Sequence, residues 1–206
     1  MPRSDVDDEL SREALTYSAP ARFLHWTVAA LVIAALPLGF IIADRYETNV
    51  PEGPGKASFE ATTELLSSSH KLIGLTILAL MIVRLGYRLT HGAPRPEPTL
   101  AGWEKGLSHA VHWTLYLLLI AVPIGGYLGI SYGDYLSIFG VKIPGLVALH
   151  EGDNHDKISE MIFKYHGIGA TVIMWLAGFH ILAALYHRYV KKDAVIARMV
   201  PGRQDA

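Results

Sequence analysis

YHGIGATVIMWLAGFHILAALYHRY, residues 165–189, is the stretch of sequence that decides the fold. Two of its three histidines, His166 and His180, are fourteen residues apart. On a helix, with about 100° and 1.5 Å per residue, their side chains point within roughly 40° of each other and lie about 21 Å apart. The residues between them are apolar enough for a membrane helix, so each imidazole lies in a low dielectric near one membrane surface. Neutral imidazole is a common ligand of haem iron, and we therefore expect this helix to contribute one ligand to each of two stacked haems.

The composition is that of a membrane protein. Of the 206 residues, 51% are hydrophobic, and they are gathered into long runs, which agrees with a positive mean hydropathy. A formal net charge of −1 leaves no basic domain to neutralise phosphates, so no binding of nucleic acid is expected. The chain has no cysteine, which excludes disulfides, iron–sulfur clusters and covalently attached c-type haem. Any haem must be held by axial ligands and packing alone.

Four apolar runs predict an all-α membrane protein, a bundle of four transmembrane helices in one domain over residues 17–206. The expected helices are at about 21–43, 70–89, 109–130 and 163–189. Residues 1–16 are polar and acidic and are predicted to be a mobile tail. The connection 44–69 is predicted to be a polar loop, and the longest connection, 131–164, is expected to cap one side of the bundle.

The distribution of Lys and Arg predicts the orientation. Four spans put both termini on one side of the membrane, and that side holds twelve of the eighteen Lys and Arg residues. By the positive-inside tendency, both termini are predicted to be cytoplasmic.

This orientation sorts four histidines by depth. His25 and His180 lie near the cytoplasmic surface, whereas His70 and His166 lie near the outer surface. We expect His25 and His180 to hold the iron of an inner haem, and His70 and His166 that of an outer haem. The alternative for each histidine is a structural role at the headgroup boundary.

Other histidines compete for these roles. His109 and His112 are three residues apart on the third helix, where ligation, a turn at the interface and a quinone contact explain them equally well. Trp113 would share the quinone contact. His187, seven residues after His180, has no assigned role.

Arg84 is a candidate cofactor-binding residue. It lies fourteen residues after His70, so it faces the same way at the inner depth. A guanidinium at the centre of a membrane helix costs about 2.5–3.5 kcal/mol on insertion scales, so it needs a partner. A haem propionate is the expected partner, and snorkelling to cytoplasmic headgroups is the alternative.

Glycines on the helices predict places of close approach. Small residues let another helix or a flat macrocycle come near the backbone. The candidates for this are Gly39, Gly74, Gly125, Gly126, Gly167 and Gly169.

Several runs of sequence resemble bacterial cytochrome b561, the four-helix di-haem b cytochrome of the inner membrane. They are ARFLHW (21–26), SSHKLIG (68–74), MIVRLGYRL (81–89), HAVHWTLYLLLIAVPIGGYL (109–128) and, most specifically, FHILAALYHRYVKKDAVIARMVP (179–201). The resemblance implies haem ligands at His25, His70, His166 and His180 in the pairing above. It also implies a multi-pass protein that transfers electrons between a quinone and a second redox partner. Members act as superoxide oxidases, which pass electrons from superoxide through the haems to ubiquinone.

The charge of the outer segments does not fit superoxide oxidation. Superoxide is an anion that a positive outer mouth would steer, yet the outer segments carry ten carboxylates against six cations. Local placement of Lys71, Lys142 or Lys164 could still form a positive funnel.

Three classes of function therefore remain open. The first is a stand-alone di-haem oxidoreductase that uses quinone and a small outer-side donor. The second is a haem b membrane anchor subunit that carries electrons from a hydrogenase or dehydrogenase partner. The third is a non-redox membrane protein whose histidines are structural or bind another metal. The absence of a long soluble extension favours the first class over the second.

Overall fold

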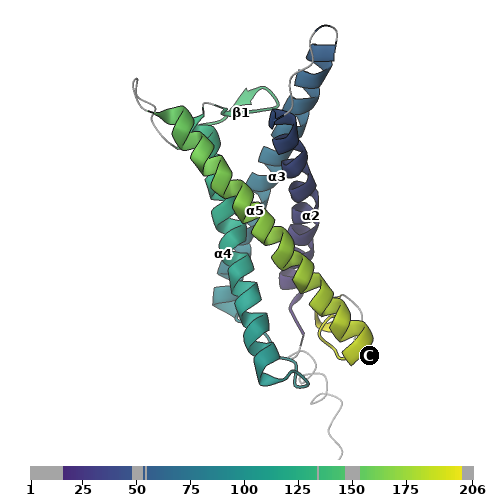
Figure 1. The fold of residues 1–206 in the computed structure, drawn as a ribbon. Coiled ribbons are helices and arrows are strands. Elements are labelled where there is room, and N and C mark those ends of the chain that lie inside the picture. Colours follow the sequence, from purple (N-terminus) through teal and green to yellow (C-terminus); the bar gives the residue numbers. More distant parts are fainter. Residues whose placement is uncertain (1–15, 48–52, 54, 134, 147–153, 201–206) are drawn as a thin grey trace, which may run out of the picture.

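Four long helices form the molecule in the computed structural model, which describes residues 16–47, 53, 55–133, 135–146 and 154–200 (Figure 1). The helices are α2 (Ala19–Glu47), α3 (Gly55–His91), α4 (Gly102–Tyr132) and α5 (His155–Tyr186). Each is long and apolar enough to cross a membrane. The predicted all-α bundle of four spanning helices is therefore confirmed.

The helices pack in sequence order. α2 lies against α3, α3 against α4, and α4 against α5, whereas α2 and α5 touch much less. The start of α2 and the end of α5 lie at the same end of the bundle, the lower end in Figure 1. We call this the tail end and the opposite end, which carries the hairpin labelled β1, the loop end.

The helices are longer than hydropathy predicts. The predicted loop over 44–69 is wrong for its second half, because α3 already begins at Gly55; α5 likewise begins at His155, before the predicted residue 163. Hydropathy marks only the part of a helix that fits the hydrocarbon. The first turns of α3 are polar but rich in good helix formers, and they continue the helix outside that layer. The predicted mobile tail, 1–16, lies outside the described residues except for Thr16.

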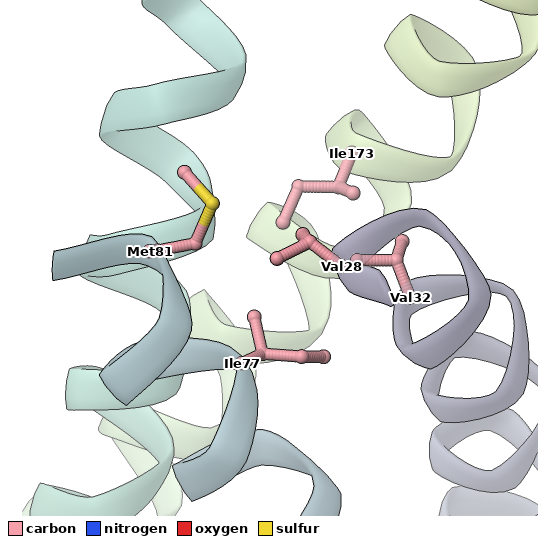
Figure 2. Packing of buried hydrophobic residues seen from close by; sticks show 5 residues of the cluster. All are labelled: Val28, Val32, Ile77, Met81 and Ile173. Carbon is pink, nitrogen blue, oxygen red and sulfur yellow. The ribbon is translucent and has the colours of Figure 1, made fainter. Parts of the chain in front are cut away.

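A small apolar core lies at the middle depth of the bundle. Figure 2 shows its buried side chains, Val28 and Val32 from α2, Ile77 and Met81 from α3, and Ile173 from α5. Ile173 is seven residues from each of His166 and His180. The core therefore lies between the depths of the two histidines of α5.

A hairpin packs on the loop end of α3. Strands β1 (Ser137–Ile138) and β2 (Val141–Lys142) pair antiparallel, and both residues of the turn between them have positive φ, 50° at Phe139 and 78° at Gly140. The Phe139 N–H donates to Ser68 Oγ over 2.8 Å. Lys71 Nζ donates to the carbonyls of Tyr135 and Ser137 over 3.1 and 2.9 Å.

At the tail end, the segment after α5 folds back over the start of α2. It contains the π-helix η1 (His187–Lys191) and the 3₁₀-helix η2 (Ala197–Met199). Trp26 Nε1 donates to the Met199 carbonyl over 2.7 Å, and the Tyr17 N–H donates to the Arg198 carbonyl over 3.3 Å. Lys191 forms an ion pair with Glu104, in the first turn of α4, at 2.8 Å.

A close contact between α4 and α5 depends on Gly169. A Cβ at this position would lie 2.5 Å from Val122 Cγ2, whereas a Cβ at Gly167 would meet nothing within 4 Å. Gly169 therefore has a packing role, as small residues commonly do between membrane helices.

We predict that Gly169→Ala destabilises the protein. The added methyl group forces α4 and α5 apart, and such overpacking costs about 1–3 kcal/mol. The thermal midpoint of the detergent-purified protein should fall clearly below that of Gly167→Ala, the matched control. Equal midpoints for the two variants would show that this contact does not limit stability.

Candidate functional site

Four of the predicted histidines meet in two pairs. At the tail end, His25 of α2 faces His180 of α5, with ring centres 6.2 Å apart and ring planes at 79°. At the loop end, His70 of α3 faces His166 of α5, with ring centres 6.1 Å apart and ring planes at 82°. The sequence-predicted partners are thus brought together, and helix α5 contributes to both pairs.

The spacing of both pairs fits two axial ligands of one iron. Metal–nitrogen bonds of about 2 Å on each side, with roughly 1 Å from each nitrogen to its ring centre, separate two ring centres by about 6 Å. No group of three or more His, Cys, Asp or Glu side chains suited to a metal ion occurs in the described ranges. The pairs therefore suit a metal that brings its remaining ligands with it, as haem iron does.

Backbone carbonyls fix the loop-end pair. His70 Nδ1 lies 3.1 Å from the Ala35 carbonyl of α2, and His166 Nδ1 lies 2.9 Å from the Val122 carbonyl of α4. A carbonyl oxygen only accepts, so both Nδ1 atoms carry the proton. In each neutral ring, Nε2 then keeps the free lone pair that binds a metal. The loop-end pair fits haem in the hydrogen-bonded state shown here.

Two glycines make these hydrogen bonds possible. A Cβ at Gly39 would lie 3.1 Å from His70 Cε1, and a Cβ at Gly126 would lie 2.9 Å from His166 Cε1. Each glycine follows the accepting carbonyl by four residues, on the same face of the helix. We call each combination of carbonyl and glycine a histidine seat. Gly39 and Gly126 thus make room for an imidazole. A Cβ added at Gly74, Gly125 or Gly167 would meet nothing within 4 Å.

The tail-end pair is held differently. Arg84 Nη2 donates to His25 Nδ1 over 3.0 Å, and the guanidinium lies 5.2 Å from the centre of the Tyr116 ring. Because His25 Nδ1 accepts, the proton of the neutral ring is on Nε2. The spacing to His180 fits haem, but binding iron through His25 Nε2 requires Arg84 to leave Nδ1. Arg84 thus contacts His25, a predicted haem ligand, and lies at the same depth as the tail-end pair, as its spacing from His70 predicts.

His112 is a close neighbour of the tail-end pair. Its ring centre is 5.1 Å from that of His180, shorter than two axial bonds allow, and its Nδ1 donates to the Ser108 carbonyl over 2.6 Å. His25 therefore fits the ligand position opposite His180 better than His112 does. His109 is exposed, with its ring centre 6.1 Å from that of Trp113.

Two further residues of this half of the bundle are His187 and Tyr116. His187 Nδ1 lies 2.6 Å from a carboxylate oxygen of Asp193, so it belongs to the folded-back segment. Tyr116, which the sequence analysis did not single out, lies one turn after His112 on the same face of α4. That spacing was the available signal.

An apolar groove of about 470 Å³ lies at the loop end between α3 and α4. Its lining includes Leu75, Leu78, Ile124 and Tyr127. The Tyr127 hydroxyl donates to the Pro144 carbonyl, which ties the groove to the segment after β2.

The sequence is similar to those of known proteins over most of its length. A family model described as prokaryotic cytochrome b561 matches residues 16–202. The chain is 30% identical to a probable superoxide oxidase CybB from Yersinia pestis, over 91% of this chain and 97% of that protein. It is 26% identical to cytochrome b561 homolog 1 from Escherichia coli K12, over 91% and 98%. It is 22% identical to a probable Ni/Fe-hydrogenase B-type cytochrome subunit from Rhizobium leguminosarum, over 91% and 87%.

Proposed function

Because this chain belongs to the prokaryotic cytochrome b561 family, and is thus a multi-pass haem b protein of the inner membrane, we propose that it transfers electrons between ubiquinone and a small donor through two haems. The observation that carries the proposal is the pair of ring spacings, 6.2 Å at the tail end and 6.1 Å at the loop end. The proposed axial ligands are His25 with His180 and His70 with His166.

Haem b in each pair would supply a carrier that accepts and releases one electron at a time. The protein orients the ligands. The Ala35 and Val122 carbonyls fix Nδ1 of His70 and His166, which leaves the lone pair of each Nε2 free for iron. Between the two pairs, the core around Ile173 excludes water from the middle of the bundle.

We further propose that both termini are cytoplasmic, as the Lys and Arg distribution predicts, so that the loop end faces outward. Superoxide is the leading donor, because the Yersinia pestis relative is named a probable superoxide oxidase. Two superoxide anions would lose one electron each to give two O₂. The two electrons and two protons from water would convert one ubiquinone to ubiquinol.

Lys71 provides a local positive charge for such a donor. It follows His70 directly, and its ammonium lies on the Tyr135 and Ser137 carbonyls at the loop end. A cation in this position attracts an anion even where the surrounding segments are acidic overall. Two places suit quinone: the surface with His109, His112 and Trp113, and the apolar groove beside Tyr127.

A second candidate is the anchor-subunit role. The Rhizobium leguminosarum relative is named a hydrogenase cytochrome subunit, and it covers nearly the same part of this chain. In that role a redox protein partner would replace the small donor.

The ligand assignment predicts which haem each substitution removes. His166→Ala and His70→Ala should each remove the loop-end haem, and His180→Ala and His25→Ala the tail-end haem. Each variant should keep about half of the bound haem, measured as pyridine haemochrome per protein. If His112→Ala removed one haem while His25→Ala kept both, the tail-end assignment would be wrong.

The position of Arg84 predicts a change in reduction potential. A nearby cation favours the reduced, less positive centre, so Arg84→Gln should lower the potential of the tail-end haem and leave the loop-end haem nearly unchanged. Arg88→Gln, one turn further along α3, is the matched control. Equal shifts in the potentials of both haems, or no shift in either, would show that the charge of Arg84 does not act on the tail-end haem. Snorkelling to headgroups would then explain Arg84.

The donor and acceptor can be tested directly. The oxidised protein is exposed to a pulse of superoxide, with and without a ubiquinone analogue, and haem absorbance is followed. We expect rapid haem reduction, then reoxidation that depends on the quinone. Haems that stay oxidised in superoxide but are reduced by quinol would contradict the proposal that superoxide is the donor, and would favour the anchor-subunit role.

A further inference from the structure

Two buried donor atoms lie one helical turn from a proposed haem ligand and have no partner. They are Arg22 Nε and Ser67 Oγ, and neither has a hydrogen-bond partner within the described ranges. Arg22 precedes His25 by three residues on α2, and Ser67 precedes His70 by three residues on α3. Residues three apart on a helix lie on the same face. Each unpartnered donor is therefore on the ligand-bearing face of its helix.

Ser67 differs from the hydroxyl residues around it. Thr63 and Ser69 each donate to the carbonyl four residues earlier, over 2.8 and 2.7 Å, which is the usual way to satisfy a hydroxyl on a helix. Ser68 donates to Glu64 over 2.8 Å. Ser67 makes no such bond, although only 7% of its surface is exposed. A buried donor without a partner is destabilising, so an acceptor that the polypeptide does not supply is expected beside it.

Arg22 needs an anionic acceptor. A guanidinium is charged at any physiological pH and only donates hydrogen bonds. The other guanidinium near the tail-end pair, that of Arg84, already contacts His25 Nδ1 at 3.0 Å. The Nε–H of Arg22 thus remains for an oxygen anion that lies between α2 and its neighbours.

Both donors lie on the surface side of their histidine. Helix α2 begins at the tail end, so Arg22 is about 4.5 Å nearer to the tail-end surface than His25. Helix α3 begins at the loop end, so Ser67 is nearer to the loop-end surface than His70 by the same rise. Haem b carries two propionates, and buried carboxylates are costly unless they are paired, so this edge of the ring belongs toward the nearer surface. Both donors lie in that direction.

We propose that Arg22 binds a propionate of the tail-end haem and that Ser67 binds a propionate of the loop-end haem. This inference rests on the proposed function and adds the residues that fix how each haem is turned about its axial bonds. The Arg22 Nε–H and the Ser67 hydroxyl donate to carboxylate oxygens, and no bond is made or broken. The donor is a cation at one end and a neutral group at the other, so the tail-end contact is the stronger one.

The tail-end contact can be tested by spectroelectrochemistry on the haem-loaded full-length protein. Arg22→Gln removes the cation that faces the propionate, so the reduction potential of the tail-end haem should fall and that of the loop-end haem should stay the same. Arg22→Lys keeps the charge and should restore most of the potential. Arg95→Gln, an exposed arginine at the same end, is the control and should change neither haem. An unchanged tail-end potential in Arg22→Gln would overturn this contact and leave a lipid phosphate as the partner of Arg22.

The loop-end contact can be tested by haem release to an excess of apomyoglobin. A hydrogen bond to a charged group is worth roughly tenfold or more in an equilibrium constant, so Ser67→Ala should release the loop-end haem about tenfold faster and the tail-end haem at the original rate. Ser69→Ala removes a hydroxyl that bonds within its own helix, and it should release both haems as the unaltered protein does. Equal release rates in the two serine variants would overturn the loop-end contact.

Haem dimethyl ester separates a propionate contact from an indirect effect. In protein reloaded with this compound, whose propionates carry no charge, Arg22→Gln and Ser67→Ala should lose most of their effects. Effects of full size with the ester would show that both residues act through the polypeptide, and would overturn the inference. A protein that bound no haem would fail the proposed function, whereas one whose two haems ignored both substitutions would fail this inference alone.

Discussion

A carbonyl inside a helix already accepts the N–H of the residue four positions later, and its second lone pair is reachable only where no side chain covers it. In this bundle that condition is met twice. Gly39 uncovers the Ala35 carbonyl and Gly126 uncovers the Val122 carbonyl. Each carbonyl then receives an imidazole from the next helix in the sequence. The same contact satisfies a polar group in a low dielectric, fixes the tautomer and joins two helices.

The two seats give the bundle an internal repeat. A carbonyl of α2 accepts a hydrogen bond from a histidine of α3, and a carbonyl of α4 accepts one from a histidine of α5. Each of these carbonyls lies close in sequence to a proline of its helix, Pro37 in α2 and Pro123 in α4. The tail end has no such repeat, because Arg84 reaches His25 there and His112 approaches His180. The two ends of one bundle therefore offer chemically different surroundings to what would otherwise be equivalent histidine pairs.

Much of this site follows from the sequence, and the limits have physical causes. The fourteen-residue spacing in α5 and the depths of His25 and His70 were enough to predict the pairs, because helix geometry fixes direction and rise. The starts of α3 and α5 were predicted too late in the sequence. Hydropathy detects only the apolar part of a helix, and both helices begin with polar turns outside the hydrocarbon. The accepting carbonyls could not be predicted at all. Every residue has one, and only the packing of neighbouring helices decides which is used.

Glycine shows the same limit in detail. The sequence offered six helical glycines as places of close approach without separating them. In the structure Gly39 and Gly126 each lie against an imidazole, and Gly169 lies against Val122. A Cβ added at the other three, Gly74, Gly125 and Gly167, would meet nothing within 4 Å. The difference depends on helix crossing points, which a single sequence does not contain.

The folded-back segment after α5 bears on biogenesis. Residues 187–200 leave the ribosome after all four helices, yet they hold the start of α2 through Trp26 and the first turn of α4 through Glu104. The tail end of the bundle is thus fastened last, once the final helix is in the membrane. Until then the neighbourhood of His25 and His180 lacks its covering segment. With both termini cytoplasmic, as proposed above, that order would leave the tail-end pair open to haem delivered from the side on which the chain is synthesised.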